Sequence, residues 1–333
     1  MKAMLLTTQA KIEEKPLQLF EIPTPRPKDD EILVKILACG VCHTDLHIVE
    51  GDLSLKKTPT IPGHEIIGII EEIGFNVTKH NKDEIVGIAW LYQACGTCKF
   101  CLRGDENLCN DAIYTGYHKD GGYAEYIVIK ESYAYKIPKN LSITNAAPLM
   151  CAGVIGYRSY RLAELLEGER LGLFGFGASA HIVIQIAQYY NIETYVFTRS
   201  ENHKQHALEM GASWVGTSKE DPPHKIDRAI TFAPSGPLIL DVLRVLDKGG
   251  TIAINAIHLS DIPKISYNLL WYEKKIKSIA NVTRQDAIEF LQLAGKIPIK
   301  TEVLTYFLKD ANKALYDLKT SKFNGAAVLT FDS

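Results

Sequence analysis

The sequence predicts an α/β chain in which a doubly wound parallel sheet is joined to a predominantly β domain. Before about residue 150, short strand-like runs are separated by Pro and Gly, which is typical of a β-rich domain. From about residue 152 the pattern changes to strand followed by helix, which indicates parallel strands. A glycine-rich run, residues 172–180, joins the first of these strands to the first of these helices. With 333 residues and 46% hydrophobic content, the chain can build about two ordinary cores.

The strands expected in the first domain are short and end at turn-forming residues. Examples are the ranges Glu31–Cys39, Ile66–Ile73 and Tyr123–Ile129. From about Ala287 onward the sequence returns to mixed character. We find neither an internal repeat nor a low-complexity linker.

The second domain alternates strands with helices. Parallel strands are expected at Leu171–Phe174, Thr194–Thr198, Arg228–Phe232 and Thr251–Ile254, with helices at Ala178–Tyr190, Asn202–Glu209 and Pro237–Leu246. The stretch Leu171–Ile192 contains no Asp, Glu, Lys or Arg, but its three glycines and its polar residues, such as Gln185 and His181, argue against a membrane span. We interpret it as a buried strand that runs into a glycine turn.

The glycine turn has the spacing of a dinucleotide-binding motif. Gly175 permits a tight turn, Gly177 lets the backbone approach a pyrophosphate, and Ala180 takes the third position, where Ala is an accepted substitute. The pattern G-x-G-x-x-A is weak alone, but here it follows a predicted strand, opens a predicted helix and precedes a second strand. A dinucleotide is therefore expected at Gly175, Gly177, Ala178, Ser179 and Ala180.

The end of the second strand indicates which dinucleotide binds. An NAD site usually has Asp or Glu there, about 20 residues on, to hold the ribose 2′-hydroxyl. Here the strand ends at Thr198-Arg199-Ser200, with Lys204 one turn later. Arg199 could pair with a 2′-phosphate and Ser200 could donate to it, which favours NADP over NAD. Two alternatives stay open: Glu201 could reach the ribose, and Arg199 could be a solvated surface residue.

Four cysteines in one short loop indicate a metal. Cys95, Cys98, Cys101 and Cys109 form the pattern C-x2-C-x2-C-x7-C, and we call residues 95–109 the cysteine loop. Four thiolates at this spacing suit a closed, tetrahedral structural zinc, with Zn–S bonds of about 2.3 Å and no position left for a substrate. The alternatives are free thiols or disulfides, which this spacing does not favour. The loop is therefore expected to have a structural role.

Three cysteines remain outside this loop. Cys39 sits in an apolar run and is interpreted as a core residue. Cys42 lies in Cys-Gly-Val-Cys-His-Thr-Asp-Leu-His, His64 in Pro-Gly-His-Glu and Cys151 in Pro-Leu-Met-Cys-Ala-Gly. Taken singly, each has a plain alternative, because a buried Cys is usually a small hydrophobic residue and a lone His a satisfied polar group. With these motifs, the chain resembles the zinc-dependent medium-chain alcohol dehydrogenases over nearly its whole length.

The resemblance implies that Cys42, His64 and Cys151 hold a catalytic zinc, which makes two zinc ions per chain. Charge separates the two metals. Four thiolates would leave the zinc of the cysteine loop at a net charge of about −2 and a poor Lewis acid. Two thiolates and a neutral imidazole would leave the other zinc near neutral and able to polarise an oxygen.

The resemblance also implies roles for four residues near the catalytic zinc. Thr44 resembles the hydroxyl that accepts a hydrogen bond from the bound alcohol, and His47 resembles the outer end of a proton relay. Asp45 resembles the carboxylate that orients His64. Glu65 resembles an alternative ligand or electrostatic partner. The alternatives are a helix N-cap for Thr44 or Asp45, a surface position for His47 and a buried ion pair for Glu65.

Further matches and departures concern single positions. Trp90 lies where the family has an aromatic wall of the substrate pocket, although a core Trp is an alternative. Arg284 matches a position that contacts the cofactor pyrophosphate. His43 occupies a place where some relatives carry Arg toward the phosphates, and Ile155 replaces a Thr that many relatives place beside the nicotinamide.

The resemblance implies a GroES-like catalytic domain over residues 1–151 and 286–333, and a Rossmann cofactor domain over residues 152–285. It implies reversible NAD(P)-linked oxidation of an alcohol to an aldehyde or ketone by a homodimer or homotetramer. The sequence does not identify the alcohol. Two alternatives stay open: a zinc-containing reductase of enals or quinones on the same fold, and a non-enzymatic nicotinamide-binding protein.

Composition and the first residues bear on partners and location. A net charge of −2 and a pI near 6.6, with no basic stripe, argue against a nucleic-acid partner. The N-terminal residues turn polar at once and contain no long apolar core or cleavage pattern. A cytoplasmic protein without a membrane segment is expected, with its thiols kept as metal ligands in a reducing compartment.

Overall fold

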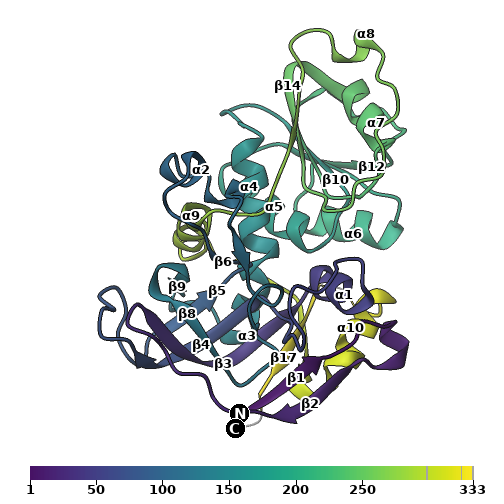
Figure 1. Cartoon of the computed structure of the whole chain (residues 1–333). Coiled ribbons are helices and arrows are strands. Elements are labelled where there is room, and N and C mark those ends of the chain that lie inside the picture. The colour runs from purple at the N-terminus through teal and green to yellow at the C-terminus, as the bar shows by residue number, and fades with distance from the viewer. Residues whose placement is uncertain (298, 324, 332–333) are drawn as a thin grey trace. The chain divides into compact units, whose positions relative to one another are not determined.

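A computed structural model of the chain describes residues 1–297, 299–323 and 325–331, which form two compact units (Figure 1). Unit 1 comprises Met1–Cys151 and Asn281–Ser333, and unit 2 comprises Ala152–Ala280. The chain returns to unit 1 at Asn281, a few residues before the expected boundary at 286. The difference arises because the next helix begins at Arg284 and packs within unit 1, so the segment leading into it belongs there too.

Within the described residues, the main sheet of unit 1 has seven strands. Its order is β16 (Val303–Phe307), β17 (Ala326–Thr330), β3 (Glu31–Val41), β4 (Glu65–Ile73), β5 (Ile85–Ile88) and β9 (Ala134–Lys136), while β8 (Tyr126–Lys130) pairs with the first half of β3. β17 pairs antiparallel with the second half of β3, so the end of the chain completes a sheet begun near its start (Figure 1). Apolar residues of β3, such as Ile32, Val34 and Ile36, are buried in the core of this unit.

Shorter elements complete unit 1. Two antiparallel strand pairs are β1 (Lys2–Leu6) with β2 (Leu17–Glu21) and β6 (Leu91–Gln93) with β7 (Ile113–Tyr114). The α-helices are α1 (His43–Glu50), α2 (Lys99–Leu102), α3 (Ile143–Ala146), α9 (Arg284–Ala294) and α10 (Ala311–Lys319). The 3-10 turns are η1 (Ile12–Glu14), η2 (Glu106–Leu108), η3 (Glu131–Tyr133), η4 (Ala147–Met150) and η5 (Leu308–Asp310). Cys39 is fully buried in the core of unit 1, which confirms its interpretation as a core residue.

The strand expected from Tyr123 begins only at Tyr126. The reason is that Tyr123 bonds to other segments: its N–H donates to Pro62 O (2.9 Å) and its carbonyl accepts from Met4 N (2.8 Å). Glu125 O in turn accepts from Ile36 N at 2.8 Å. Tyr123 therefore joins the N-terminal strand to the segment that leads into β4.

Unit 2 holds a parallel sheet whose six described strands have the order β12 (Trp214–Gly216), β11 (Thr194–Phe197), β10 (Leu171–Phe174), β13 (Ile226–Thr231), β14 (Leu246–Ile254) and β15 (Lys275–Ser278). In chain order this is third, second, first, fourth, fifth and sixth, the arrangement of dinucleotide-binding sheets. The helices of this unit are α4 (Ala152–Leu162), α5 (Ala178–Tyr189), α6 (Glu201–Glu209), α7 (Leu238–Val245) and α8 (Tyr267–Leu270).

The two faces of this sheet bury separate cores, as a doubly wound sheet requires. One face packs Leu171 and Leu173 with Val183 of α5. The other packs Phe174 and Phe197, stacked at 4.1 Å between ring centroids, with helix α7. The α/β fold class predicted from the sequence is thereby confirmed, and the three expected helices begin and end within one residue of the structure.

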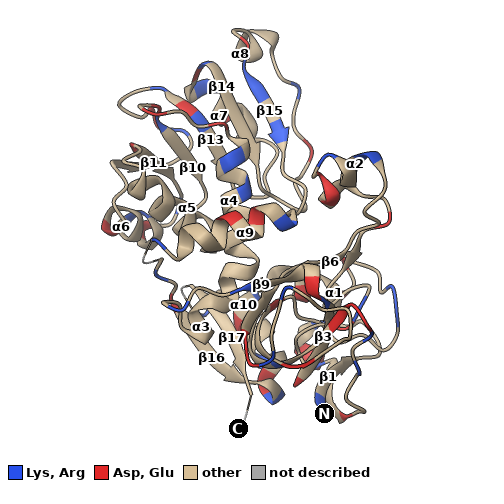
Figure 2. Ribbon diagram, turned by 90° about the vertical axis from the view of Figure 1, so that its left-hand side faces the viewer, with Lys and Arg blue, Asp and Glu red and all other residues tan. Residues whose placement is uncertain are grey.

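Acidic and basic residues occur together on both units (Figure 2). On β15, for example, Lys275 and Lys277 both pair with Glu164, at 3.3 and 3.6 Å. None of the helices among the described residues is long and apolar enough to cross a membrane.

Candidate catalytic centre, cysteine loop and cofactor turn

Four potential metal ligands converge inside unit 1. The ligand atoms of Cys42, His64, Glu65 and Cys151 all lie within 4.8 Å of one another. Cys42 precedes α1, His64 and Glu65 stand at the start of β4, and Cys151 follows η4. Of the two groups of potential ligands among the described residues, this one includes an imidazole and a carboxylate beside its thiols. We call these four residues the catalytic centre, after the role proposed for them below.

Asp45 holds this group together through four hydrogen bonds. Its Oδ1 accepts from His64 Nδ1 at 3.0 Å and from Gly63 N at 3.1 Å. Its Oδ2 accepts from Cys42 N at 3.0 Å and from the Tyr123 hydroxyl at 3.3 Å. Because Nδ1 of His64 donates to Asp45, Nε2 is the ring nitrogen left for a metal. The N-cap of α1 is Cys42, so the alternative of an N-cap role for Thr44 or Asp45 is wrong; Asp45 is the third residue of α1 and accepts from the N–H of that cap.

The charges of the catalytic centre suit a divalent cation. A hydrogen bond from the Cys151 thiol lowers the pKa of Cys42 well below its usual value and raises that of Cys151. Burial opposes protonation of His64, but the charge of Asp45 and its hydrogen bond outweigh it and raise the pKa of His64. Burial and the nearby thiolate of Cys42 raise the pKa of Glu65. A cation bound here would displace these protons, as expected for a Cys, Cys, His zinc set.

Glu65 reaches this interior position because a glycine faces it. Gly40 on β3 pairs with Glu65 on β4 in the antiparallel register. A Cβ at Gly40 would lie 1.8 Å from Glu65 Oε2. The sequence analysis did not single out Gly40, because only the register of the two strands places it there.

Thr44 and His47 both lie on α1, and the side chain of His47 is more exposed to solvent than that of Thr44. The Thr44 side chain is buried, with Oγ1 3.8 Å from Cys42 Sγ. The His47 side chain is 27% exposed, and its Nδ1 lies 2.8 Å from Oδ2 of Asp52. The arrangement is compatible with a hydroxyl near the metal and a histidine near solvent, and both roles stay predictions.

An aromatic cluster adjoins His64. Trp90 lies edge-on to the His64 ring, with 4.9 Å between centroids, and stacks on Tyr114 at 5.1 Å. Tyr117 and His118 extend the cluster. Of this cluster, only Trp90 was predicted from the sequence, because the other three aromatic rings come from a separate segment, the end of β7 and the residues that follow it.

The cysteine loop brings its four sulfurs within 4.8 Å of one another. Cys101 Sγ lies 3.8 Å from Cys95 Sγ and 3.6 Å from Cys98 Sγ. Four sulfurs about 2.3 Å from a central zinc would be about 3.8 Å apart at tetrahedral corners. The backbone N–H groups of Thr97 and Cys98 lower the pKa of Cys95 to about 6, while desolvation raises that of Cys101 to about 12. The spacing of the sulfurs therefore fits a closed zinc site.

Arg284 has a partner that the sequence analysis missed. Its backbone N and Nε both donate to Glu106 Oε1 at 2.9 Å, and Nη2 lies 3.3 Å from Oε2. Its guanidinium also covers the ring of Tyr133, 5.0 Å from the centroid. This ion pair anchors the start of α9 to η2 within unit 1, and contact with a cofactor pyrophosphate stays a prediction.

The glycine turn between β10 and α5 has the backbone that phosphate binding needs. Gly175 has φ +92°, which favours glycine, and its N–H donates to Phe197 O at 2.9 Å. A Cβ at Gly177 would meet no described atom within 4 Å, so the backbone there is open to an incoming group. Ala178 and Ser179 form the first turn of α5, whose N–H groups can bind an anion. Ala180 is fully buried against the sheet.

The end of β11 places the residues that the sequence analysis linked to cofactor choice. Thr198 is buried, with its N–H bonded to Gly216 O at 2.8 Å, and Arg199 is exposed. The Ser200 hydroxyl accepts from His203 N at 3.4 Å and so caps α6. Lys204 pairs with Glu201 at 2.8 Å. The preference for NADP over NAD stays a prediction.

Known proteins resemble this chain along nearly its full length. Residues 28–139 match the family described as alcohol dehydrogenase GroES-like domain. A Mycobacterium tuberculosis protein named "Probable alcohol dehydrogenase AdhA" is 44% identical over 320 residues, which cover 94% of this chain and 92% of that protein.

Two solved structures are similar in fold. The Helicobacter pylori protein named CAD, complexed with NADP(H), has a TM-score of 0.88 and 25% identity, and covers 99% of this chain and 97% of its own. A thermostable alcohol dehydrogenase of Pyrobaculum aerophilum, with bound cobalt and zinc, has a TM-score of 0.88, 25% identity and 99% coverage of both chains.

These similarities favour alcohol oxidation over the two alternatives, the reduction of enals or quinones and non-enzymatic binding of a nicotinamide. The 44% identity to a protein named as an alcohol dehydrogenase extends over 94% of this chain and therefore spans both units. The chain therefore belongs to the zinc-dependent medium-chain alcohol dehydrogenase family, and it is an oxidoreductase that acts on alcohols with NAD(P).

Proposed function

We propose that this alcohol dehydrogenase uses one zinc for catalysis, held by Cys42, His64 and Cys151, and a second for structure, held by the cysteine loop. The observation that carries the proposal is the convergence of two thiols and one imidazole whose Nδ1 is already engaged by Asp45. Zinc at this position supplies a Lewis acid that lowers the pKa of an alcohol, while the nicotinamide supplies the acceptor for hydride. The reaction is the reversible oxidation of an alcohol to an aldehyde or ketone.

The residues of α1 would remove the hydroxyl proton of the substrate. Thr44 Oγ1 lies beside the sulfur of Cys42, where it can accept a hydrogen bond from the alcohol. His47 is partly exposed and can pass a proton to solvent, with its ring oriented by Asp52. Glu65 supports the catalytic centre as an alternative ligand or as an electrostatic partner.

The cofactor would bind at Gly175, Gly177, Ala178, Ser179 and Ala180, with its adenosine ribose at Thr198, Arg199, Ser200 and Lys204. We favour NADP because Arg199 is exposed and can pair with a 2′-phosphate. The NADP(H) complex of the Helicobacter pylori relative is in keeping with this preference. Arg284 would contact the pyrophosphate by giving up some of its hydrogen bonds to Glu106 and donating to the phosphate instead.

The substrate would be a small alcohol or aldehyde with an apolar part beside Trp90. The edge-on contact of Trp90 with His64 supports this position for the apolar part. We further propose that the GroES-like catalytic domain comprises residues 1–151 and the C-terminal segment, that residues 152–280 form the cofactor domain, and that the enzyme acts in the cytoplasm as a homodimer or homotetramer.

A substrate panel tests this proposal. Primary, secondary and aromatic alcohols are oxidised with NADP and with NAD, and enone reduction is measured in parallel. We expect alcohol turnover that requires bound zinc and exceeds enone reduction, with NADP preferred. Enone reduction without alcohol turnover would overturn the proposal, and light scattering of the purified enzyme would decide between dimer and tetramer.

A further inference from the structure

A buried tyrosine lies on the side of Asp45 that faces away from His64. The Tyr123 hydroxyl is 3.3 Å from Asp45 Oδ2, and both side chains are fully buried. We propose that Tyr123 is a positioning residue of the catalytic centre, whose hydroxyl fixes the Asp45 carboxylate and thereby the His64 ring. The proposal rests on the proposed function, because it takes His64 as a zinc ligand.

The hydrogen bonds of Asp45 are evenly divided between its two oxygens. Oδ1 accepts from His64 Nδ1 and Gly63 N, while Oδ2 accepts from Cys42 N and the Tyr123 hydroxyl. A carboxylate held by two donors on each oxygen has one defined orientation. Without the hydroxyl, Oδ2 would keep a single donor, and rotation of the carboxylate would tilt the bond to His64.

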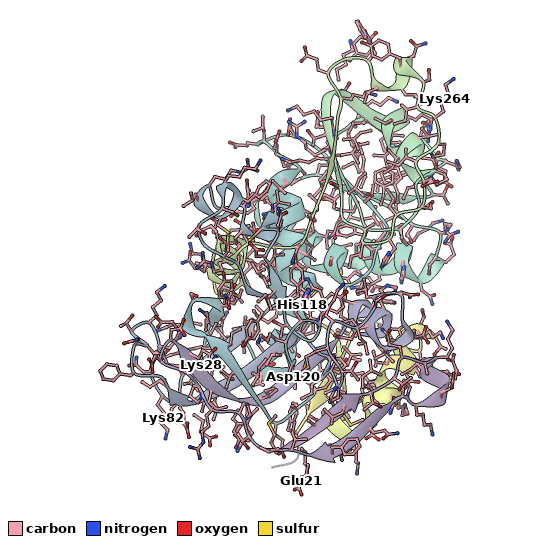
Figure 3. All side chains as sticks on the ribbon, viewed as in Figure 1. Glu21, Lys28, Lys82, His118, Asp120 and Lys264 are labelled. Atoms are coloured by element: carbon pink, nitrogen blue, oxygen red, sulfur yellow. The ribbon has the colours of Figure 1, made fainter. Side chains whose placement is uncertain are left out.

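Tyr123 is itself held in place by the backbone around it. Its N–H donates to Pro62 O at 2.9 Å, and its carbonyl accepts from Met4 N at 2.8 Å. Its ring packs on Gly63, where φ is +97° and a Cβ would lie 2.5 Å from Tyr123 Cδ1. The loop that carries His118 and Asp120, both labelled in Figure 3, leads directly into this residue. The hydroxyl therefore acts from a rigid position rather than from a mobile side chain.

The hydroxyl is present as a donor under working conditions. Burial and the charge of Asp45 raise the pKa of Tyr123 well above its ordinary value. A protonated Tyr donates one hydrogen bond, and Asp45 Oδ2 is the acceptor within reach. The contact is thus a long hydrogen bond to a carboxylate in a buried site, where the low dielectric strengthens a hydrogen bond relative to water.

The test removes the hydroxyl and leaves the ring. In Tyr123→Phe, we expect zinc to leave the catalytic centre about tenfold faster in the presence of a chelator, as is typical when an outer partner of a metal ligand is lost. Cobalt exchanged into the catalytic centre should show a shifted visible absorption spectrum. The rate of zinc loss from the cysteine loop should stay unchanged.

Tyr92→Phe is the matched control. Tyr92 is also buried in unit 1, and its hydroxyl donates to Val128 O at 3.0 Å. This variant also loses a tyrosine hydroxyl and its hydrogen bond, but the partner is a backbone carbonyl and neither Asp45 nor a residue of the catalytic centre. We expect Tyr92→Phe to release zinc at the wild-type rate and to keep the wild-type cobalt spectrum. The control therefore shows whether a loss of fold stability alone could cause the changes expected in Tyr123→Phe.

A second variant tests whether Tyr123 acts through Asp45. In the Asp45→Ala background, Tyr123→Phe should add nothing to the rate of zinc loss, because the partner of the hydroxyl is already gone. The proposal would be overturned if Tyr123→Phe accelerated zinc loss by the same factor in the unaltered chain and in the Asp45→Ala variant. It would also be overturned if Tyr123→Phe alone kept the wild-type rate of zinc loss and the wild-type cobalt spectrum. If the unaltered chain binds no zinc at Cys42, His64 and Cys151, the proposed function itself fails, which is a different result.

Discussion

The cysteine loop and the catalytic centre are assembled in opposite ways. The loop takes all four sulfurs from residues 95–109, and three of its cysteines are only half-buried. The catalytic centre takes its ligands from the start of α1, the start of β4 and the end of η4, and fixes them through the buried carboxylate of Asp45. A structural metal site needs only the spacing of its own loop, whereas a reactive one depends on the surrounding fold to position each ligand.

The largest effect expected from this contrast is on turnover. Cys42→Ser should lower kcat about a thousandfold or more, because a Lewis acid supplies several kcal/mol of stabilisation in the transition state. Its Tm should stay close to that of the unaltered chain, since the cysteine loop keeps its metal. Steady-state kinetics and thermal unfolding check both parts, and a variant that unfolds before it loses activity would break the comparison.

The cysteine loop should respond in the reverse way. Cys98→Ser leaves three thiolates without a full ligand set, so we expect Tm to fall by roughly 5–10 °C. The turnover per folded molecule should change little. Calorimetry together with active-site titration measures the two quantities separately. Loss of activity in molecules that remain folded would mean that the loop takes part in the reaction.

Substitutions at glycines sharpen the comparison without replacing a potential ligand. Gly40→Ala places a methyl group 1.8 Å from Glu65 Oε2, and we expect about 1–3 kcal/mol of destabilisation with a tenfold or so fall in turnover. Gly104→Ala in the cysteine loop is the control: its φ of +85° costs about 1–2 kcal/mol, but no described atom lies within 4 Å of the new Cβ. Equal effects of both variants on turnover would contradict the dependence of the catalytic centre on the fold behind it.

A smaller effect is expected at the exposed end of α1. His47→Gln should slow turnover about tenfold near neutral pH and leave the zinc content unchanged, because in the proposed mechanism the residue relays a proton and is not a zinc ligand. High pH or added base should restore part of the rate. An unchanged pH–rate profile would remove His47 from the mechanism.

The smallest effect on kcat is expected at Arg199, at the end of β11, another site that was predicted from local spacing. Arg199→Asp should raise the KM for NADP about tenfold and shift preference toward NAD, with kcat little changed, because the 2′-phosphate lies far from the hydride. A tenfold preference of the unaltered enzyme for NAD, about 1.4 kcal/mol, would show that Arg199 is a solvated residue.

The contrast between the cysteine loop and the catalytic centre also explains which features could be predicted from the sequence. The clustering of the four sulfurs in the cysteine loop and the position of the glycine turn were predicted from spacing alone, because their members are neighbours in the chain. The ligand set Cys42, His64 and Cys151 needed a resemblance to a known family, since no local pattern joins it.

Other features of the site could not be found from spacing or resemblance. Gly40 faces Glu65 only through the register of β3 and β4, and Tyr123 reaches Asp45 across a long stretch of chain. The pairing of Arg284 with Glu106 was missed for the same reason. Such contacts depend on tertiary packing, which leaves no periodic signal in the sequence.

The division of labour between the two centres is tested most directly by counting zinc in active enzyme. Elemental analysis of the purified chain, performed on the sample used for kinetics, should give two zinc ions per chain, and Cys42→Ser should give one in a folded and inactive chain. A single zinc in a fully active preparation of the unaltered chain would contradict the account.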